Sequence, residues 1–376
     1  MILDYEILRL IWWALLGVLL VAFAVTDGFD MGVAALLPAV ARNDAQRRQV
    51  INTVGPVWEG NQVWFILGGG AIFAAWPALY AVSFSGFYLA MFLILVALII
   101  RPVAFKFRSK RDEPAWRARW DAALCFSGAV PALLFGVAVG NVLQGVPFHF
   151  DSDLRPFYTG SFFGLLNPFA LLCGLVSLAM LVLHGATWLQ IKADGEPAAR
   201  ARRYGLVAAL VVIALFAVGG VWVANLDGYR IVSALDPSGP SNPLRKEVVL
   251  EAGLWLDNFR QWPLLWLVPL AGFAGAGMAL LGLFWRVAAL SFLGSKLSVA
   301  AIIATVGAAM FPIILPSSSQ PGHSLTVWDG SSSHYTLGVM LFATVVLLPI
   351  VLLYTAWVYK VLWGTVSESD VNKDMY

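Results

Sequence analysis

The chain has 376 residues, of which 60% are hydrophobic and 12% charged, and its formal net charge is +2. An ordinary soluble domain carries roughly twice that share of charged residues because its surface must be wetted. The composition therefore excludes a soluble protein and predicts one that exposes apolar side chains to lipid. The small net charge and the lack of a long basic block exclude a nucleic-acid-binding surface.

Nine apolar runs are long enough to cross a hydrocarbon core of about 30 Å, which takes roughly 20 helical residues. Each run is predicted to be helical because an unpaired backbone amide is costly in lipid. The expected fold is all-α, a single polytopic membrane domain over 1–376 with about nine transmembrane helices, and eight is the alternative count. The predicted spans are approximately 8–37, 60–77, 79–101, 121–144, 162–189, 204–226, 262–285, 292–316 and 336–362.

The Lys and Arg residues of the connections predict the orientation of these spans. Threading nine spans inward from the outside places 18 of the 24 basic residues on the inner side, in agreement with the positive-inside rule. The amino terminus is therefore expected outside and the carboxyl terminus in the cytoplasm. The basic residues left on the outer side are Arg9, Arg155, Arg230, Arg245, Lys246 and Arg260.

The first span contains two acids, which is unusual because an ionisable group at the centre of a membrane helix costs roughly 2.5–3.5 kcal/mol. Asp27 and Asp30 are three residues apart and so share one face of the helix. Gly28 and Gly32 lie four residues apart, and such a pair of small residues allows another backbone to approach closely. That face is predicted to be a packing seam that holds two carboxyls.

Glu59 stands at the inner start of the second span, so all three acids are expected in the cytoplasmic half of the membrane. Carboxyls in a low-dielectric seam can exchange protons near neutral pH, and a line of them suits a proton-uptake path. In the alternative interpretation the acids cap helix ends or bond Asn61, Gln62 and Thr26 in a static network. The residues alone leave both interpretations open.

Other polar residues indicate structural roles. Arg101 and Pro102 are expected to end the third helix. His184 is the one histidine within a span, and the further ligands of a haem or metal site are not evident around it, so a structural or exposed histidine is expected. Cys125 and Cys173 fall in apolar runs and are expected to be buried thiols.

Several motifs follow one another along the chain in a fixed order and spacing. They are Thr26-Asp27-Gly28-Phe29-Asp30-Met31-Gly32, Trp58-Glu59-Gly60-Asn61-Gln62-Val63-Trp64, Phe84-Ser85-Gly86-Phe87-Tyr88, Gly140-Asn141-Val142-Leu143-Gln144-Gly145 and Leu353-Tyr354-Thr355-Ala356-Trp357. With these motifs the chain resembles subunit II of the cytochrome bd quinol oxidases over essentially its whole length.

The resemblance implies a subunit of an electrogenic terminal oxidase in the bacterial cytoplasmic (inner) membrane. Such an oxidase takes electrons from quinol on the outer side and reduces O2 to water with protons from the cytoplasm. Two haems b and one haem d are expected in the partner, subunit I, so neither a catalytic residue nor a metal ligand is expected here. The family also implies small accessory subunits, lipid contacts and a structural quinone in subunit II, whose site no residue identifies.

The resemblance also implies roles for individual residues. By position, Glu59 matches the proton-route carboxylate of the family, Asp27 and Asp30 match its acidic motif, and Trp64 matches an aromatic residue at the oxygen-access region. Lys106 departs from the pattern, since relatives carry an acid there, and this puts the proton entry in doubt. The alternatives are a proton-coupled permease working alone, whose inverted repeats are not evident, and a structural subunit with static acids.

Overall fold

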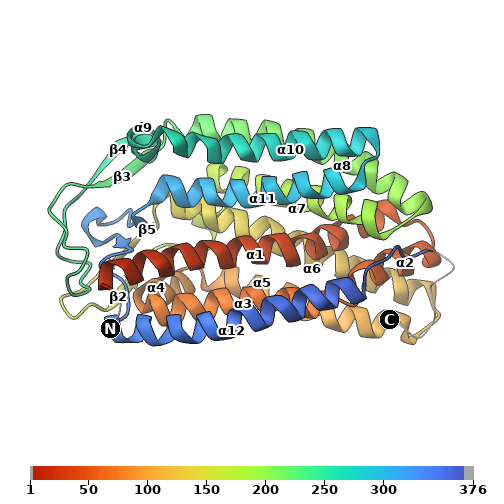
Figure 1. The fold of residues 1–376 in the computed structure, drawn as a ribbon, viewed down its shortest axis with the longest axis horizontal. Helices are drawn as coiled ribbons and strands as arrows, with labels where there is room; N and C mark the ends of the chain where they lie inside the picture. Colours follow the sequence, from red (N-terminus) through yellow and green to blue (C-terminus); the bar gives the residue numbers. More distant parts are fainter. Residues whose placement is uncertain (1–2, 368–376) are drawn as a thin grey trace.

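The protein is a bundle of long helices that lie side by side, shown in Figure 1 for the computed structural model. The structure describes residues 3–367, so the predictions for the two chain ends and for the inner-side Lys373 lie outside the described residues. The long helices are α1 (Tyr5–Val40), α3 (Trp58–Ala75), α5 (Tyr88–Phe107), α6 (Pro114–Gln144), α7 (Pro168–Lys192), α8 (Gly195–Val223), α10 (Leu267–Trp285), α11 (Ala288–Met310) and α12 (His334–Val361).

Shorter elements gather at the two ends of the bundle (Figure 1). One end, here called the hairpin end, carries antiparallel pairs of strands: β1 (Phe148–Phe150) with β2 (Pro156–Tyr158), β3 (Asp227–Ile231) with β4 (Val248–Ala252), and β5 (Ile313–Leu315) with β6 (Leu325–Thr326). The opposite end, here called the α2 end, carries α2 (Asp44–Val54) and the 3-10 turn η1 (Arg108–Lys110). The remaining short helices are α4 (Pro77–Gly86), α9 (Asp257–Gln261), η2 (Phe163–Leu165), η3 (Leu254–Leu256), η4 (Pro263–Trp266) and η5 (Pro321–His323).

Within residues 3–367, eight helices are long and apolar enough to cross a membrane: α1, α5, α6, α7, α8, α10, α11 and α12. The helix α3 is not among them, because polar residues such as Glu59 and Asn61 in its first turn lower its mean hydropathy. It still joins the two ends of the bundle, since Trp58 is buried beside α2 and Ala75 is buried with Leu8 near the hairpin end. The ninth crossing and the inside-outside orientation stay predictions.

The helices differ from the predicted spans at several boundaries. The span predicted over 79–101 is broken at Phe87 between α4 and α5, and α5 runs on to Phe107, so the prediction that Arg101 and Pro102 end this helix is wrong. The span predicted over 162–189 becomes helix α7 only at Pro168. Helix α11 ends at Met310, and the apolar residues that follow form β5 instead of completing the span predicted to reach 316.

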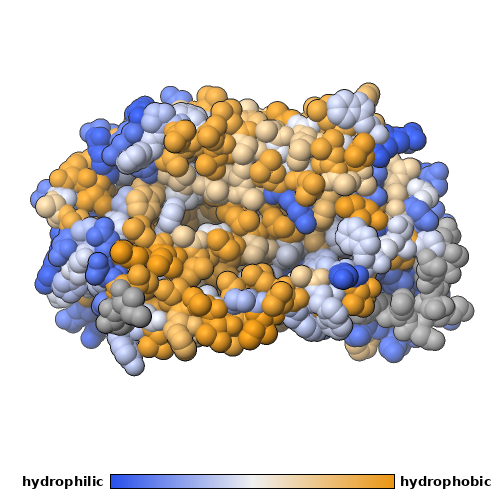
Figure 2. All heavy atoms as spheres, viewed as in Figure 1, coloured by the Kyte–Doolittle hydropathy of each residue, from blue (hydrophilic) through white to orange (hydrophobic). Residues whose placement is uncertain are grey.

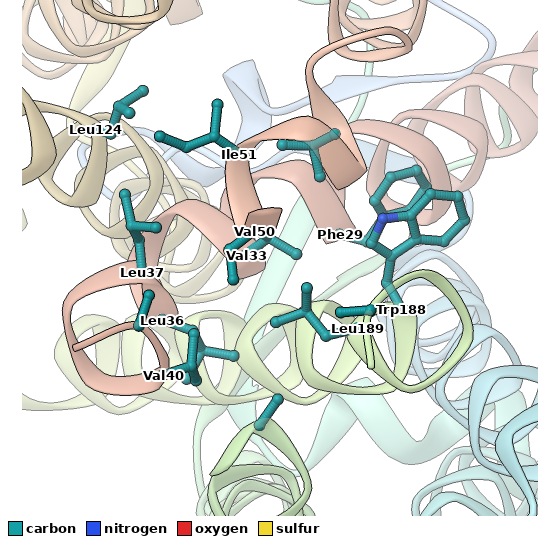
Figure 3. Close-up of a cluster of buried hydrophobic side chains, with 14 of the residues drawn as sticks. Phe29, Val33, Leu36, Leu37, Val40, Val50, Ile51, Leu124, Trp188 and Leu189 are labelled. Carbon is teal, nitrogen blue, oxygen red and sulfur yellow. The ribbon is translucent and has the colours of Figure 1, made fainter. Parts of the chain in front are cut away.

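At the α2 end, apolar side chains from α1, α2, α6 and α7 form a continuous core (Figure 3). Phe29 of α1 stacks on Trp188 of α7, with ring centroids 4.0 Å apart and planes 16° apart. Phe29 lies between the two acids of α1 in the sequence. Its packing therefore fixes the rotation of α1, and with it the directions in which Asp27 and Asp30 point.

The two helices α1 and α7 touch through their backbones. A Cβ atom added at Gly32 would lie 1.9 Å from the carbonyl oxygen of Leu181, and one at Gly185 would lie 2.4 Å from the carbonyl carbon of Gly32. Gly28 receives the Leu181 side chain instead, 2.8 Å from where its Cβ would stand. The predicted close approach of another backbone to this face of α1 is thus confirmed at Gly32.

Candidate functional site

Asp27 lies inside the bundle in an ion pair with Arg101. Arg101 Nη1 lies 2.6 Å from Asp27 Oδ1, and the two side chains are 1% and 0% exposed. Arg101 Nη2 also donates to the Ser127 carbonyl at 3.3 Å. The pair therefore joins α1 to α5, and the guanidinium joins both helices to α6.

Asp30 has different partners on the same helix. Asn61 of α3 donates from Nδ2 to Asp30 Oδ2 at 2.8 Å. The hydroxyl of Tyr359 on α12 donates in turn to Asn61 Oδ1 at 2.7 Å. Two successive hydrogen bonds thus connect Asp30 of α1, through Asn61 of α3, to the last turn of α12.

The acid pair is not balanced in charge. Asp27 and Asp30 provide two carboxyls, whereas Arg101 provides one guanidinium, and Asn61 is neutral. Among the described residues, Asp27 Oδ2, Asp30 Oδ1 and Arg101 Nε have no hydrogen-bond partner although they are buried. Two buried carboxyls beside one guanidinium leave one negative charge uncompensated if both are ionised, and such a charge is costly in the interior.

The other predicted site residues lie apart from this pair. Glu59 is in the first turn of α3 but is exposed, and it lies two residues from Asn61, so the two side chains point to different faces of the helix. Trp64 is 6% exposed and belongs to a buried apolar cluster with Phe23 and Met31 of α1. The structure therefore unites Asp27 and Asp30 with Asn61, and leaves Glu59 on the surface at the α2 end.

Two residues of the site, Arg101 and Tyr359, were not predicted from the sequence. Arg101 was interpreted as a helix terminus because a proline follows it, although an arginine within an otherwise apolar run, in a chain with two buried acids, signals an internal ion pair. Tyr359 lies 298 residues from Asn61, and nothing in its local sequence indicates their contact. Lys106, the residue that departs from the family pattern, lies in the last turn of α5 at the α2 end.

His184 is 0% exposed, and both of its ring nitrogens are engaged. Nδ1 lies 2.8 Å from Ser295 Oγ and Nε2 lies 2.9 Å from the Val25 carbonyl. His184 is therefore a structural histidine, as expected. Cys125 and Cys173 are free cysteines of intermediate exposure, whereas buried thiols were expected. Within residues 3–367, no group of three or more His, Cys, Asp or Glu side chains is placed to hold a metal ion.

Charged side chains at the α2 end anchor α2 to the neighbouring helices. Arg108 pairs with Asp121 at 2.5 Å and with Asp44 at 2.9 Å, and Arg117 pairs with Asp44 at 2.8 Å. Burial by itself raises the pKa of Asp44, but the positive charges and hydrogen bonds of Arg108, Arg48 and Arg117 outweigh it and lower the pKa below its ordinary value. The Asp44 carboxylate is thus held ionised at the start of α2, where the helix dipole also favours it.

The sequence was compared with known protein families and with individual relatives. The family model for cytochrome bd terminal oxidase subunit II matches residues 8–362. The chain belongs to this family. It is 52% identical over 374 residues to cytochrome bd-I ubiquinol oxidase subunit 2 of Escherichia coli K12, with 99% of both chains covered. It is 30% identical over 361 residues to cytochrome bd ubiquinol oxidase subunit 2 of Bacillus subtilis, covering 96% of this chain and 97% of the relative.

A solved structure of bd oxidase from Geobacillus thermodenitrificans has the same fold. One of its chains superimposes with a TM-score of 0.65 at 15% identity, over 94% of this chain and 98% of that chain. At this identity the likeness shows the fold alone. Together with the eight apolar helices, membership of the family makes the chain a multi-pass membrane subunit of a terminal oxidase, an oxidoreductase.

Proposed function

We propose that the chain is subunit II of an electrogenic cytochrome bd quinol oxidase in the bacterial inner membrane. The enzyme would oxidise quinol at the outer face and reduce O2 to water with protons taken from the cytoplasm. The observation that carries this proposal is the 52% identity, over nearly the full length of both chains, to a relative named as subunit 2 of a ubiquinol oxidase. The partner is a subunit I, and small accessory subunits, lipid and a structural quinone are further partners expected in such a complex.

The haems are proposed to be two of type b and one of type d, all held by subunit I. His184, the histidine within a predicted span, is not free to bind a haem, because both of its ring nitrogens are occupied by hydrogen bonds within the bundle. Subunit II would then hold no redox centre and would influence the reaction only indirectly. Its tasks would be to support subunit I, to handle protons and to shape oxygen access near Trp64.

Asp30 is proposed to be the proton-holding carboxyl of this subunit. Asp27 already has the Arg101 guanidinium as counter-charge, whereas Asp30 has only the amide of Asn61. A second bare carboxylate in an apolar interior would be strongly disfavoured, so one proton neutralises the pair and resides on Asp30. Asp27 is then the fixed, ionised member of the pair.

Glu59 is proposed to pass protons toward subunit I from the α2 end. Its exposure on α3 leaves it available to the partner or to water. Neighbouring outward positions on the same helix are apolar and also exposed, namely Val63, Ile66 and Phe73. An acid at the end of an apolar outward face is suited to proton transfer between subunits.

The test is to replace Glu59 by Gln in the purified oxidase complex. We expect steady-state O2 consumption to fall several-fold while the haem optical spectrum stays normal, because the redox centres are intact and only proton delivery is slowed. Glu113→Gln is the matched control, since Glu113 is also exposed at the α2 end, and its turnover should equal that of the wild type. Unchanged turnover of Glu59→Gln with intact haems would rule out this role and favour a static, structural acid.

A further inference from the structure

A cavity of about 280 Å3 opens at the α2 end between α2, α7 and α12. Its walls include Asn52 and Thr53 of α2, Trp188 and Lys192 of α7, and Tyr359 of α12. Such a volume holds several water molecules, each of which needs polar partners, and the amide, hydroxyl and phenol groups of the walls provide them. This cavity is separate from the acid pair, because neither Asp27 nor Asp30 lines it.

The outer wall of the cavity is the segment 362–366 that follows α12, here called the C-terminal strap. Lys192 Nζ donates to the carbonyls of Leu362 and Gly364, both at 2.7 Å. Gln49 Nε2 donates to the Val366 carbonyl at 2.8 Å. The ammonium of Lys192 is thus turned toward the strap, which it holds in place across the mouth of the cavity.

Tyr359 connects this cavity to the acid pair. Its side chain lines the cavity, while its hydroxyl donates to Asn61, which donates to Asp30. Two hydrogen bonds therefore separate a space for water from Asp30. Asp27 and Arg101, close to Asp30, are paired with each other, and Lys192, which lines the cavity, is turned to the strap.

We propose that the cavity is a water-filled vestibule from which Asp30 takes up and returns its proton, with the Tyr359–Asn61 hydrogen bond closing the passage between them. When that bond opens, a hydronium ion from the vestibule gives its proton to the Asp30 carboxylate, which leaves water and a neutral carboxylic acid. The reverse step returns the proton to water. This inference rests on the proposed proton-handling role of the subunit and gives Asp30 an entry separate from Glu59 and Lys106.

The experiment blocks the vestibule reversibly in the purified oxidase complex. Cys125 and Cys173 are first replaced by Ala, and Thr365 on the strap, which is exposed and lines the cavity, is replaced by Cys. The thiol is then modified with a bulky methanethiosulfonate reagent, which a reducing agent removes. The measured quantity is the rate of hydrogen–deuterium exchange of the carboxylic acid C=O infrared band that disappears in the Asp30→Asn variant.

We expect modification of Thr365→Cys to slow this exchange by several-fold and reduction to restore it. The control is Ala199→Cys, exposed at the same end on α8 but away from the cavity lining, whose modification should leave the rate unchanged. An unchanged rate after modification of Thr365→Cys, or the lack of any band that depends on Asp30, would overturn the inference. Glu59→Gln keeps the two proposals apart, because it should slow O2 consumption without altering the exchange of Asp30.

Discussion

Arg101 and Asp27 form an ion pair from which water is almost wholly excluded. Removing one partner of such a pair leaves an unpaired charge in the interior, which costs about 3–5 kcal/mol, whereas removing both partners costs much less. The stability of the subunit should therefore depend on the match between the two residues more than on the presence of either one.

We expect Arg101→Met to lower the melting temperature of the purified complex strongly, and Asp27→Asn combined with Arg101→Met to recover much of the loss. The measurement is thermal unfolding of the wild type, the two single variants and the double variant, analysed as a double-mutant cycle. Arg119→Met, a change at an exposed position of α6, is the control and should leave the melting temperature unaltered. Equal losses in the single and double variants would argue against a coupled pair.

At the scale of single residues, the sequence predicted only the features that depend on residues close together in the chain. The spacing of Asp27 and Asp30 was enough to place both carboxyls on one face of one helix. The pairing of Asp27 with Arg101, 74 residues away, is set by the packing of α1 and α5 against α6, and no local pattern specifies it. The role of Asn61 was foreseen only as one of several static bonding partners, and Tyr359 was not foreseen.

At the scale of elements, the contact of α1 with α7 depends on glycine. A side chain at Gly32 has no space that a rotamer change could open, because the obstacle is the backbone carbonyl of Leu181. Any residue larger than glycine must push the two helices apart, which also shifts Phe29 from its stack on Trp188.

We expect Gly32→Ala to destabilise the complex by ~1–3 kcal/mol, the usual cost of overpacking, and to lower its melting temperature accordingly. Gly17→Ala is a matched control on the same helix, because a Cβ at Gly17 meets nothing within 4 Å. That change should be neutral or slightly stabilising. Similar melting temperatures for the two variants would contradict the backbone contact.

Element types were easier to predict than element ends. Hydropathy identifies a long helix because its lipid-facing residues must be apolar, but it cannot see where an apolar stretch pairs with a strand. Ile313–Leu315 pairs with β6 although its residues are as apolar as the helix before it. The 3-10 turn before α7 and the break at Phe87 were also missed, because both lie within apolar stretches that hydropathy does not distinguish from a helix.

At the scale of the whole molecule, hydrophobic residues cover the middle of the visible face and hydrophilic residues gather toward its two ends (Figure 2). This arrangement defines two polar ends but not which of them faces the cytoplasm. The charge count predicts that the α2 end faces the cytoplasm, because the arginines of α2, η1 and α6 gather there.

Alkaline phosphatase fusions test that assignment, since the enzyme is active only outside the cytoplasm. A fusion after Asp194, between α7 and α8, should be inactive, and one after Ser238, beyond α8 and β3, should be active. The two fusions differ in the number of crossings by α8 alone. The reverse pattern of activities would invert the orientation and would place Asp30 and the vestibule on the outer side.

Helix α12 is attached to the bundle mainly through its two ends. Across its 28 residues, all of them described, Leu337 is the one that is buried. Leu337 accepts a hydrogen bond from the Trp12 indole at the hairpin end, and Tyr359 and the strap are bonded at the α2 end. The rest of the described bundle therefore packs with little contribution from α12, and the vestibule is complete only when this helix is in place.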